Sequence, residues 1–500
     1  MLFIHPAINP KSQPSIISSF IYTTFPTGIG FLAGYLRGEN SANIRIIDEH
    51  IHNFTDDMLV EEIKKLAIPK IVGISCLTIN SKRALELAEK IKQIDPEVVT
   101  VLGGVHPTVL PEECLQKKGV DIVVRGEGEN TLSELYGLIK NGKDFWHIKG
   151  ISYKGDGKII HNPGRELISN LNDIPPFPYD LFEKEIEKYR DFGTIITSRG
   201  CPYRCIFCSQ RAISGGRYRF LSTERVLEEL DLLVFRYKQK AIWFNEDNFA
   251  VNRKRLDDLL DAIIERKYNR EIQFIAELRA DGVDTELLKK LRQANFTMLS
   301  FGAETGSERL MKVIKKGETV EDNNRAIRMA HEAGIKPTTT YIFGLPTETR
   351  RERLETFRLS QKLPLDNVRF NTAIPYPGTE LYEMARREGK LKILEDWQNF
   401  NVQYYIISDD IPYVPTGVNR YVLIYDTMMA NLRTYISFKG LKSILTSPLS
   451  GGGVITMPKD WSLKDIVRIL RFGFFVFKRF AYILIRVLLY KLSRCKKVQE

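Results

Sequence analysis

Three of the six cysteines of the chain lie within eight residues, in the segment TSRGCPYRCIFC (residues 197–208). Cys201, Cys205 and Cys208 have the spacing C-x3-C-x2-C, and thiolates this close in one loop can converge on a soft metal centre. A structural zinc ion takes four ligands, and only a distant histidine could supply the fourth. Free thiols exposed on one loop would oxidise. The spacing therefore favours an iron–sulfur cluster with one iron left open for a substrate or cofactor.

The remaining cysteines, Cys76, Cys114 and Cys495, are scattered along the chain. This distribution is typical of a reducing cytosol and not of a disulfide framework. The first ten residues, MLFIHPAINP, lack the basic region of a secretory signal, so we expect no signal peptide. Both features predict a cytoplasmic protein.

Residues 1–145 alternate short apolar runs with amphipathic segments, a pattern typical of βαβ units and of a parallel sheet covered on both faces. We therefore predict a doubly wound, Rossmann-like α/β domain. Such sheets bind ligands at the carboxyl ends of their strands, where this chain carries small residues. The expected strands are 2–4, 44–47, 71–75, 98–102 and 122–124, and the expected helices are 28–37, 57–66, 82–93 and 131–139.

A hairpin and a proline-rich linker, residues 146–186, are expected to end this domain. The alternation resumes over residues 187–400, which we predict to form a partial (β/α)6 barrel of the TIM type. In such barrels the chemistry takes place at the C-terminal ends of the strands, and the cysteine segment follows the first strand directly. Residues 401–459 are expected to be a mostly helical extension. The expected barrel strands are 193–197, 241–244, 272–277, 298–302, 338–343 and 368–372.

The cysteine segment resembles the signature of the radical S-adenosylmethionine (SAM) superfamily, in which an aromatic residue, here Phe207, precedes the third cysteine. The resemblance implies a [4Fe-4S] cluster held by Cys201, Cys205 and Cys208, with SAM bound to the fourth iron through its amino and carboxylate groups. It also implies that an electron from the cluster cleaves SAM to a 5′-deoxyadenosyl radical, which removes a hydrogen atom from the substrate.

Acidic residues at two later strand ends resemble segments that contact SAM in the same family. IWFNEDNF (residues 242–249) looks like the second-strand motif, with Glu246 in place of its usual first aspartate and Asp247 next to it. FGAETGS (residues 301–307) places Glu304 at the end of the fourth strand. The resemblance implies that these acids and Phe207 form the SAM site. The alternative is that each acid only caps the next helix.

Three segments of the N-terminal domain, GISCLT, LGGVHPTVLPEE and VVRGEGENTLSEL, resemble the cobalamin (B12)-binding domain that precedes the radical SAM core in one large subfamily. The resemblance implies that glycines let the backbone approach the corrin tail and that hydroxyls hydrogen-bond the nucleotide loop. A generic doubly wound domain, which also has glycines at its strand ends, is the alternative. The expected cobalamin contacts are Ser75, Thr78, Gly103, Gly104, Gly126 and Glu127.

Asp48-Glu49-His50 looks like the start of the D-x-H-x-x-G motif whose histidine ligates cobalt in methyl carriers. The sixth residue here is Asn53 and not glycine, and the segment follows the second predicted strand and not the first. We therefore expect His50 to be an ordinary loop histidine. Cobalamin is then expected to bind without a lower histidine ligand.

The formal net charge of +11 is concentrated at the C-terminus, since residues 461–500 contain ten Lys or Arg against two Asp or Glu. A nucleic-acid-binding enzyme would spread its positive charge over the catalytic domains, so no nucleic-acid partner is expected. Residues 460–500 predict a basic amphipathic helix lying on an anionic membrane surface. A helix docked on the core, or a dimer contact, is the alternative. Its basic arc would contain Lys464, Arg468, Arg471, Lys478, Arg479 and Arg486.

We interpret the chain as a cobalamin-dependent radical SAM enzyme, most consistent with a methyltransferase acting on an unactivated carbon of a lipid-like or other small molecule near a membrane. A radical cyclase or rearrangement enzyme with the same cofactors is one alternative, and a non-catalytic corrinoid or iron–sulfur carrier is another. A reducing partner such as flavodoxin or ferredoxin is expected. No catalytic acid or base is predicted, because radical chemistry makes little demand on side-chain proton transfer.

Overall fold

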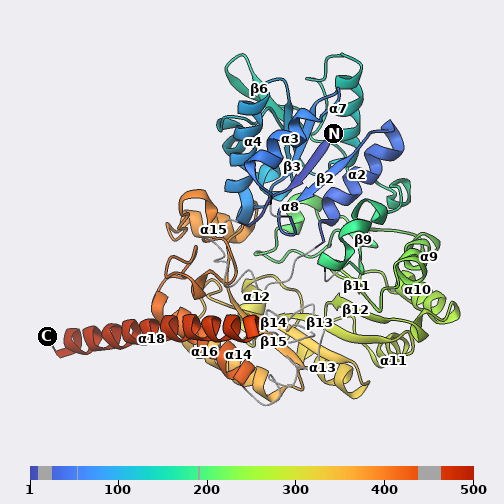
Figure 1. The fold of residues 1–500 in the computed structure, drawn as a ribbon. Helices are drawn as coiled ribbons and strands as arrows, with labels where there is room; N and C mark the ends of the chain where they lie inside the picture. Colours follow the sequence, from blue (N-terminus) through green and yellow to red (C-terminus); the bar gives the residue numbers. More distant parts are fainter. Residues whose placement is uncertain (9–24, 53, 190–191, 437–462, 500) are drawn as a thin grey trace.

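The computed structural model describes residues 1–8, 25–52, 54–189, 192–436 and 463–499. It contains two α/β domains, each built on its own sheet, and a C-terminal helical part (Figure 1). A seven-stranded sheet has the order β2-β1-β3-β4-β5-β6-β7, and a six-stranded sheet has the order β15-β14-β13-β12-β11-β8. In Figure 1 the first sheet lies above the second. The chain passes from one to the other through the proline-rich segment near residue 175.

The first sheet is parallel through its first five strands. These are β1 (Leu2–His5), β2 (Arg45–Asp48), β3 (Ile71–Ser75), β4 (Val99–Gly103) and β5 (Ile122–Val124). The hairpin of β6 (Ile151–Gly155) and β7 (Lys158–His161) extends it in antiparallel fashion. Successive residues of the central strands enter different cores, so both faces of the sheet are buried.

Helices cover each of these two faces. α2 (Thr27–Asn40) and α7 (Glu129–Lys140) pack on one face, and α3 (Asp56–Lys64), α4 (Ser81–Ile94) and α6 (Pro111–Gln116) pack on the other. The short helix α5 (Val105–Val109) follows β4 directly. This is the doubly wound arrangement that the sequence predicts, and the antiparallel hairpin at its edge is also where the sequence places it.

The second sheet is parallel throughout and follows chain order, which is the arrangement of an open barrel with β8 and β15 at its edges. The six predicted strands are present, although the first is shorter than expected because the chain leaves the sheet after Ile195. The strands are β8 (Thr194–Ile195), β11 (Ala241–Phe244), β12 (Gln273–Leu278), β13 (Phe296–Glu304), β14 (Lys336–Phe343) and β15 (Asn367–Thr372).

Helices connect these strands on the outside of the barrel, and a two-stranded ribbon lies at its C-terminal end. The ribbon pairs β9 (Ser198–Arg199) with β10 (Arg219–Phe220), and the cysteine segment lies between its two strands. The outer helices are α9 (Thr223–Asp231), α10 (Arg253–Glu265), α11 (Thr285–Gln293), α13 (Val320–Glu332) and α14 (Arg350–Lys362). Three short helices lie near the cysteine segment instead: α8 (Gln210–Ser214), α12 (Glu308–Val313) and α15 (Glu380–Arg387).

Two further helices complete the described chain. α16 (Arg420–Ile436) packs on β15 and α14, and α18 (Leu463–Gln499) lies along α16 and projects beyond the barrel (Figure 1). Ile483 and Val487 of α18 are buried in the barrel core. None of the described helices is both long and apolar enough to cross a bilayer.

The prediction of one continuous basic face on the last helix is wrong for Arg479 and Arg486. Arg479 lies 2.7 Å from Asp409 and donates to the carbonyl oxygen of Tyr405. The Arg486 guanidinium stacks over the Tyr421 ring and donates to its hydroxyl. Both arginines therefore bind the protein, because the buried face of α18 includes part of its basic arc.

The proline-rich linker packs tightly against α2 of the N-terminal domain. The Phe177 ring lies over Gly30, where an added Cβ would come within 2.2 Å of a ring carbon. Phe177 also belongs to an aromatic cluster with Phe25, Tyr179 and Phe182. The close approach is possible only because residue 30 has no side chain, so this glycine fixes how the linker sits on the domain.

We predict that Gly30→Ala lowers the free energy of unfolding by about 1–3 kcal/mol, because the methyl group must displace the Phe177 ring. Gly28→Ala in the same helix is the matched control, since nothing lies within 4 Å of its Cβ position. Gly28→Ala should leave stability unchanged or slightly raised. Thermal unfolding followed by circular dichroism measures both, and equal melting temperatures would contradict this account of the linker.

Candidate functional site

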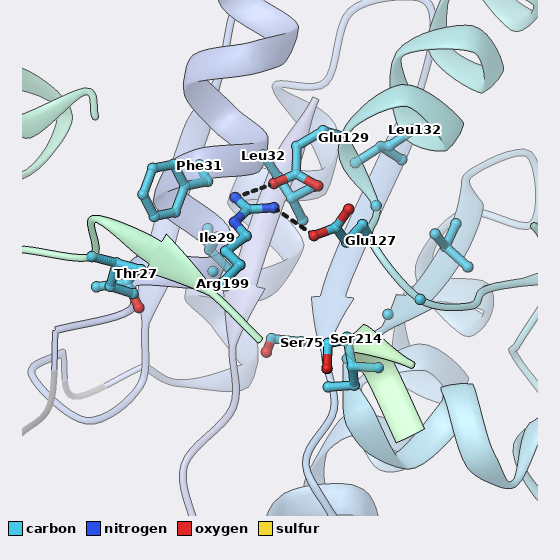
Figure 2. A pocket seen from close by; sticks show the side chains of 18 of the residues that line it. Thr27, Ile29, Phe31, Leu32, Ser75, Glu127, Glu129, Leu132, Arg199 and Ser214 are labelled. Carbon is cyan, nitrogen blue, oxygen red and sulfur yellow. Dashed lines mark hydrogen bonds and ion pairs between the residues drawn. The ribbon is translucent and has the colours of Figure 1, made fainter. Parts of the chain in front are cut away.

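A cavity of about 610 Å³ lies where the C-terminal ends of the two sheets meet. One wall comes from α2 and from the residues at the ends of β3, β4 and β5, and β9 faces it with Arg199 (Figure 2). The ends of β11 and β12 complete the wall on the side of β9. The cavity therefore occupies the edge at which both doubly wound sheets and barrels bind their ligands.

The cysteine loop follows β9 directly and is anchored by backbone contacts. Gly200 has φ +89°, and a Cβ there would lie 2.0 Å from the carbonyl oxygen of Arg217, so only glycine fits before Cys201. The amide of Ile206 donates to the carbonyl oxygen of Ile314 at 3.1 Å. β9 therefore fixes the start of the cysteine loop, and the hydrogen bond to Ile314, the residue after α12, fixes it between Cys205 and Cys208.

Cys201 and Cys205 are half-buried and Cys208 is exposed. Burial raises the pKa of the Cys201 and Cys205 thiols, that of Cys205 to about 11, so iron binding must displace their protons. In a tetrahedral zinc site the sulfurs lie about 3.8 Å apart. Among the described residues, only a set elsewhere in the fold brings three metal-ligand atoms within 4.8 Å of one another. The three thiols are not part of that set, so the loop by itself does not form a closed site for a single ion.

The other two cysteines that the structure describes cannot supply a fourth ligand. Cys76 and Cys114 are both buried in the core of the N-terminal domain, where Cys76 Sγ donates to the carbonyl oxygen of Leu77. The donor set of the loop is therefore three thiols, as expected for a [4Fe-4S] cluster with one open iron. Phe207 packs against an apolar cluster that includes Leu310 and Leu345, beside the loop.

Glu246, just after β11, accepts hydrogen bonds from the first residues of the cysteine segment. One oxygen accepts from the amide of Thr197 at 2.9 Å, and the hydroxyls of Thr197 and Ser198 donate to the two oxygens. Arg255 lies 3.8 Å from the same carboxylate. Although Glu246 borders the cavity, these contacts give it the geometry of a residue that positions the loop.

Asp247 connects the cavity with the cysteine loop. It lines the cavity, and its Oδ2 accepts a hydrogen bond from the amide of Gly200 at 3.1 Å, directly before Cys201. Desolvation by the surrounding protein raises the pKa of Asp247 to about 6, although the residue remains partly exposed at the cavity. Its charge also acts on the thiols of Cys201 and Cys208.

Glu304 ends β13 in the left-handed conformation, with φ +57°. Its carboxylate lies 3.2 Å from the buried ammonium of Lys316, which also lies 3.9 Å from Glu318. Glu304 does not line the cavity, and it lies close enough to Cys205 and Cys208 for its charge to affect both thiols. A non-glycine residue held at positive φ is uncommon and is often found at functional sites.

The sequence analysis did not identify two charged residues of this region, Glu277 and Lys316. Glu277 lines the cavity from β12, where burial raises the pKa of its carboxyl and the charges of Asp247 and Glu304 add to the effect. Lys316 lies in the turn after α12. An acid in an otherwise apolar barrel strand is a signal that could have singled out Glu277.

Five of the six expected cobalamin residues line the cavity: Ser75, Gly103, Gly104, Gly126 and Glu127. Gly104 has φ +115°, and a Cβ there would lie 2.6 Å from the carbonyl oxygen of Cys76. These glycines leave an open edge of backbone at the ends of β4 and β5, which fits a large ligand that approaches the main chain. Thr78 is outside the lining, and its hydroxyl is 3.3 Å from the buried ring of His106.

Glu127 belongs to a buried ionic cluster that joins the two halves of the cavity (Figure 2). Arg199 lies between Glu129, at 2.6 Å, and Glu127, at 3.3 Å, and Arg219 donates to Glu127 at 2.8 Å. Burial alone would raise the pKa of Glu127, but the hydrogen bond from Arg219 and the nearby arginine charges lower it overall. Glu127 therefore forms ion pairs within the protein, and these pairs connect the β9–β10 ribbon to the glycine-rich loop before α7.

Two family models match the chain. The Radical SAM superfamily model matches residues 195–360, and the B12 binding domain model matches residues 15–136. These matches confirm the predicted cofactors, which are a [4Fe-4S] cluster, SAM and cobalamin, and they confirm the predicted order of the two folds.

Curated proteins that are similar in sequence to this chain have activities that fit these two families. An uncharacterized methyltransferase of Pyrococcus horikoshii is 36% identical over 396 residues, which cover 78% of this chain and 84% of the relative. The anaerobic magnesium-protoporphyrin IX monomethyl ester cyclase of Rubrivivax gelatinosus is 27% identical over 453 residues, covering 88% and 78%. The matches therefore support an enzyme over the non-catalytic carrier.

The solved structure of the radical SAM methyltransferase TsrM from Kitasatospora setae, with cobalamin and a [4Fe-4S] cluster bound, has a TM-score of 0.65 to this chain. The identity is 20%, and the match covers 79% of this chain and 76% of that chain. At this identity the likeness shows a shared fold.

We predict that Arg199→Ala lowers the free energy of unfolding by about 3–5 kcal/mol, because it leaves Glu127 and Glu129 buried with one arginine fewer. Arg37→Ala is the matched control, since Arg37 also links the N-terminal domain to the following segment, through Asp180, but the two side chains are 43% and 44% exposed. Its loss should cost about 1 kcal/mol or less. Denaturant unfolding of both variants measures the difference, and equal losses would show that the buried cluster does not join the domains.

Proposed function

The chain belongs to the radical SAM superfamily, among the members that carry an N-terminal B12-binding domain, and from this premise we propose that it transfers a methyl group to an unactivated carbon of a small molecule. The observation that carries the proposal is the cavity of about 610 Å³ that the two domains share, which has the glycine edge of the first sheet on one side and Asp247, beside the cysteine loop, on the other. The cluster with SAM would supply the 5′-deoxyadenosyl radical, and cobalamin would supply the methyl group.

We assign the residues of the site accordingly. The three cysteines would hold the cluster, and Phe207, Asp247 and Glu304 would surround SAM, with Lys316 balancing the charge of Glu304. Glu246 would act indirectly, by holding Thr197 and Ser198 in front of the loop. Ser75, Gly103, Gly104 and Gly126 would contact cobalamin, while Thr78 would act through His106 and Glu127 through the two arginines.

A radical cyclase with the same cofactors is the second candidate, favoured by the similarity to the Rubrivivax cyclase. Product analysis separates the two activities, because methylation consumes a second SAM and yields S-adenosylhomocysteine. Neither candidate needs a side chain as acid or base. Either would need an electron donor, for which a small redox protein such as flavodoxin or ferredoxin is the proposed partner.

We predict that reduced holoenzyme given SAM with a deuterated methyl group forms 5′-deoxyadenosine and S-adenosylhomocysteine, and transfers the label to one component of a small-molecule or lipid extract. Cys205→Ala should abolish 5′-deoxyadenosine because the cluster loses a ligand. Mass spectrometry follows all three products. Formation of 5′-deoxyadenosine together with a substrate-dependent product that carries no label, and without S-adenosylhomocysteine, would favour the cyclase.

We also propose that α18 rests on an anionic membrane surface, which would place a lipid-like substrate near the enzyme. The face of α18 away from the barrel exposes large apolar side chains that recur every three or four residues, with the exposed cations Arg471 and Lys478 beside them. Positive charge beside an apolar stripe suits anionic headgroups. The exposed apolar residues are Val467, Leu470, Phe474, Phe477, Leu484, Ile485, Leu488, Leu489 and Leu492.

We predict that the full chain pellets with vesicles rich in phosphatidylglycerol, and that Phe474→Glu/Phe477→Glu largely abolishes pelleting. These side chains are 64% and 67% exposed, so the variant should fold normally. Ile68→Glu is the control, because Ile68 is 84% exposed but lies in the N-terminal domain. Unchanged pelleting would remove the membrane proposal, and conversion of a dimer to a monomer would show instead that a second copy covers the helix.

A further inference from the structure

Two histidines and an aspartate meet at the end of the first two strands, outside the lining of the cavity. β1 and β2 are parallel, and their register places His5 opposite Asp48, the last residue of each strand. His50 follows in the next turn, where its amide donates to Asp48 Oδ1 at 2.9 Å. Its Nδ1 lies 2.9 Å from the same oxygen, and its ring centroid is 4.8 Å from that of His5.

The ligand atoms of His5, Asp48 and His50 all lie within 4.8 Å of one another. Among the described residues, no other set of three histidine, cysteine or acidic side chains meets this condition. Four ligands at about 2.0–2.1 Å from a zinc ion would be roughly 3.3 Å apart, so only small movements of the side chains would close the site.

Two features of the cluster are unfavourable without a cation. Nδ1 of His5 is inaccessible to solvent and has no hydrogen-bond partner among the described residues. Asp48 is 1% exposed, and among the described residues its ion-pair partner is His50, which is charged only when protonated, and not a lysine or arginine. Buried polar atoms are normally hydrogen-bonded, and buried charges are normally paired or bound to a metal.

A neighbouring hydroxyl would orient the carboxylate. The hydroxyl of Tyr189 donates to Asp48 Oδ2 at 3.0 Å, which leaves Oδ1 directed toward His50. Metal-binding carboxylates are typically held in this way by an outer hydrogen bond. Since Tyr189 follows the linker and Asp48 ends β2, the contact also joins the N-terminal sheet to the segment that enters the barrel.

We propose that His5, Asp48 and His50 bind one divalent transition-metal ion, with water completing the coordination on the side where His50 is 23% exposed. Two imidazoles and a carboxylate suit zinc or ferrous iron, in contrast to the soft thiolates of the cluster loop. The ion would fasten the ends of β1 and β2 to each other and, through Tyr189, to the start of the barrel. The site is separate from the cavity lining, although Phe3, on the same face of β1 as His5, belongs to that lining.

The test uses the full-length holoenzyme, reconstituted anaerobically, incubated with zinc chloride and then desalted. We expect one zinc per chain by elemental mass spectrometry, and only nitrogen and oxygen ligands, at about 2.0–2.1 Å, by X-ray absorption at the zinc edge. Asp48→Asn and His50→Ala should lose the zinc while keeping cluster and cobalamin absorbance. His50 lies on a loop, so its variant decides the question if Asp48→Asn fails to fold.

Graded variants make the test specific. Tyr189→Phe should weaken zinc binding by about 10- to 100-fold, as expected for an outer-shell partner. His52→Ala is the matched control, because His52 contacts the Asp48 backbone oxygen but is not part of the cluster, and it should keep its zinc. Absence of retained zinc in the wild type, zinc unaffected by His50→Ala, or sulfur at about 2.3 Å in the zinc shell would overturn the proposal.

Discussion

The ionic cluster of Arg199, Arg219, Glu127 and Glu129 is the contact on which the relation between the two domains depends. Arg199 lies two residues before Cys201, and Glu127 lies in the glycine-rich loop after β5. The same four side chains therefore set how the cysteine loop faces the glycine edge. Because these charges are buried, a change in their geometry would leave ions without partners, and such a loss is costly. The relative position of the two proposed cofactors is thus held by a rigid contact and not by the linker alone.

A second set of contacts fixes the cysteine loop from the barrel side. Glu246 accepts hydrogen bonds from the amide and the hydroxyl of Thr197. Asp247 accepts a hydrogen bond from the amide of Gly200, and Glu304 forms an ion pair with Lys316. Acids at three strand ends thus have different tasks: one holds the loop, one links the loop to the cavity, and one lies beside the thiols with a counter-ion. This division follows from which polar groups each acid meets. Glu246 and Glu304 are buried and must be hydrogen-bonded or paired, whereas Asp247 is exposed beside the cavity.

Sequence patterns were sufficient for the alternation of strands and helices, because the period of apolar residues reports burial directly. They also identified the cysteine loop, because its chemistry is contained in eight consecutive residues. They could not assign Thr78, Glu127 or Glu246, whose contacts come from His106, Arg219 and Thr197, residues far away in the sequence. For the same reason the basic arc of α18 did not reveal that Arg479 and Arg486 bind the barrel, since that depends on Asp409 and Tyr421.

The central claim is that a cluster with an open iron and a cobalamin face one shared cavity. Electron paramagnetic resonance of holoenzyme containing both the reduced [4Fe-4S] cluster and cob(II)alamin tests it most directly, because two nearby unpaired spins interact. Mutual broadening or splitting of the two signals, altered when SAM is added, is the predicted result. A spectrum equal to the sum of the two isolated signals, indifferent to SAM, would contradict the account.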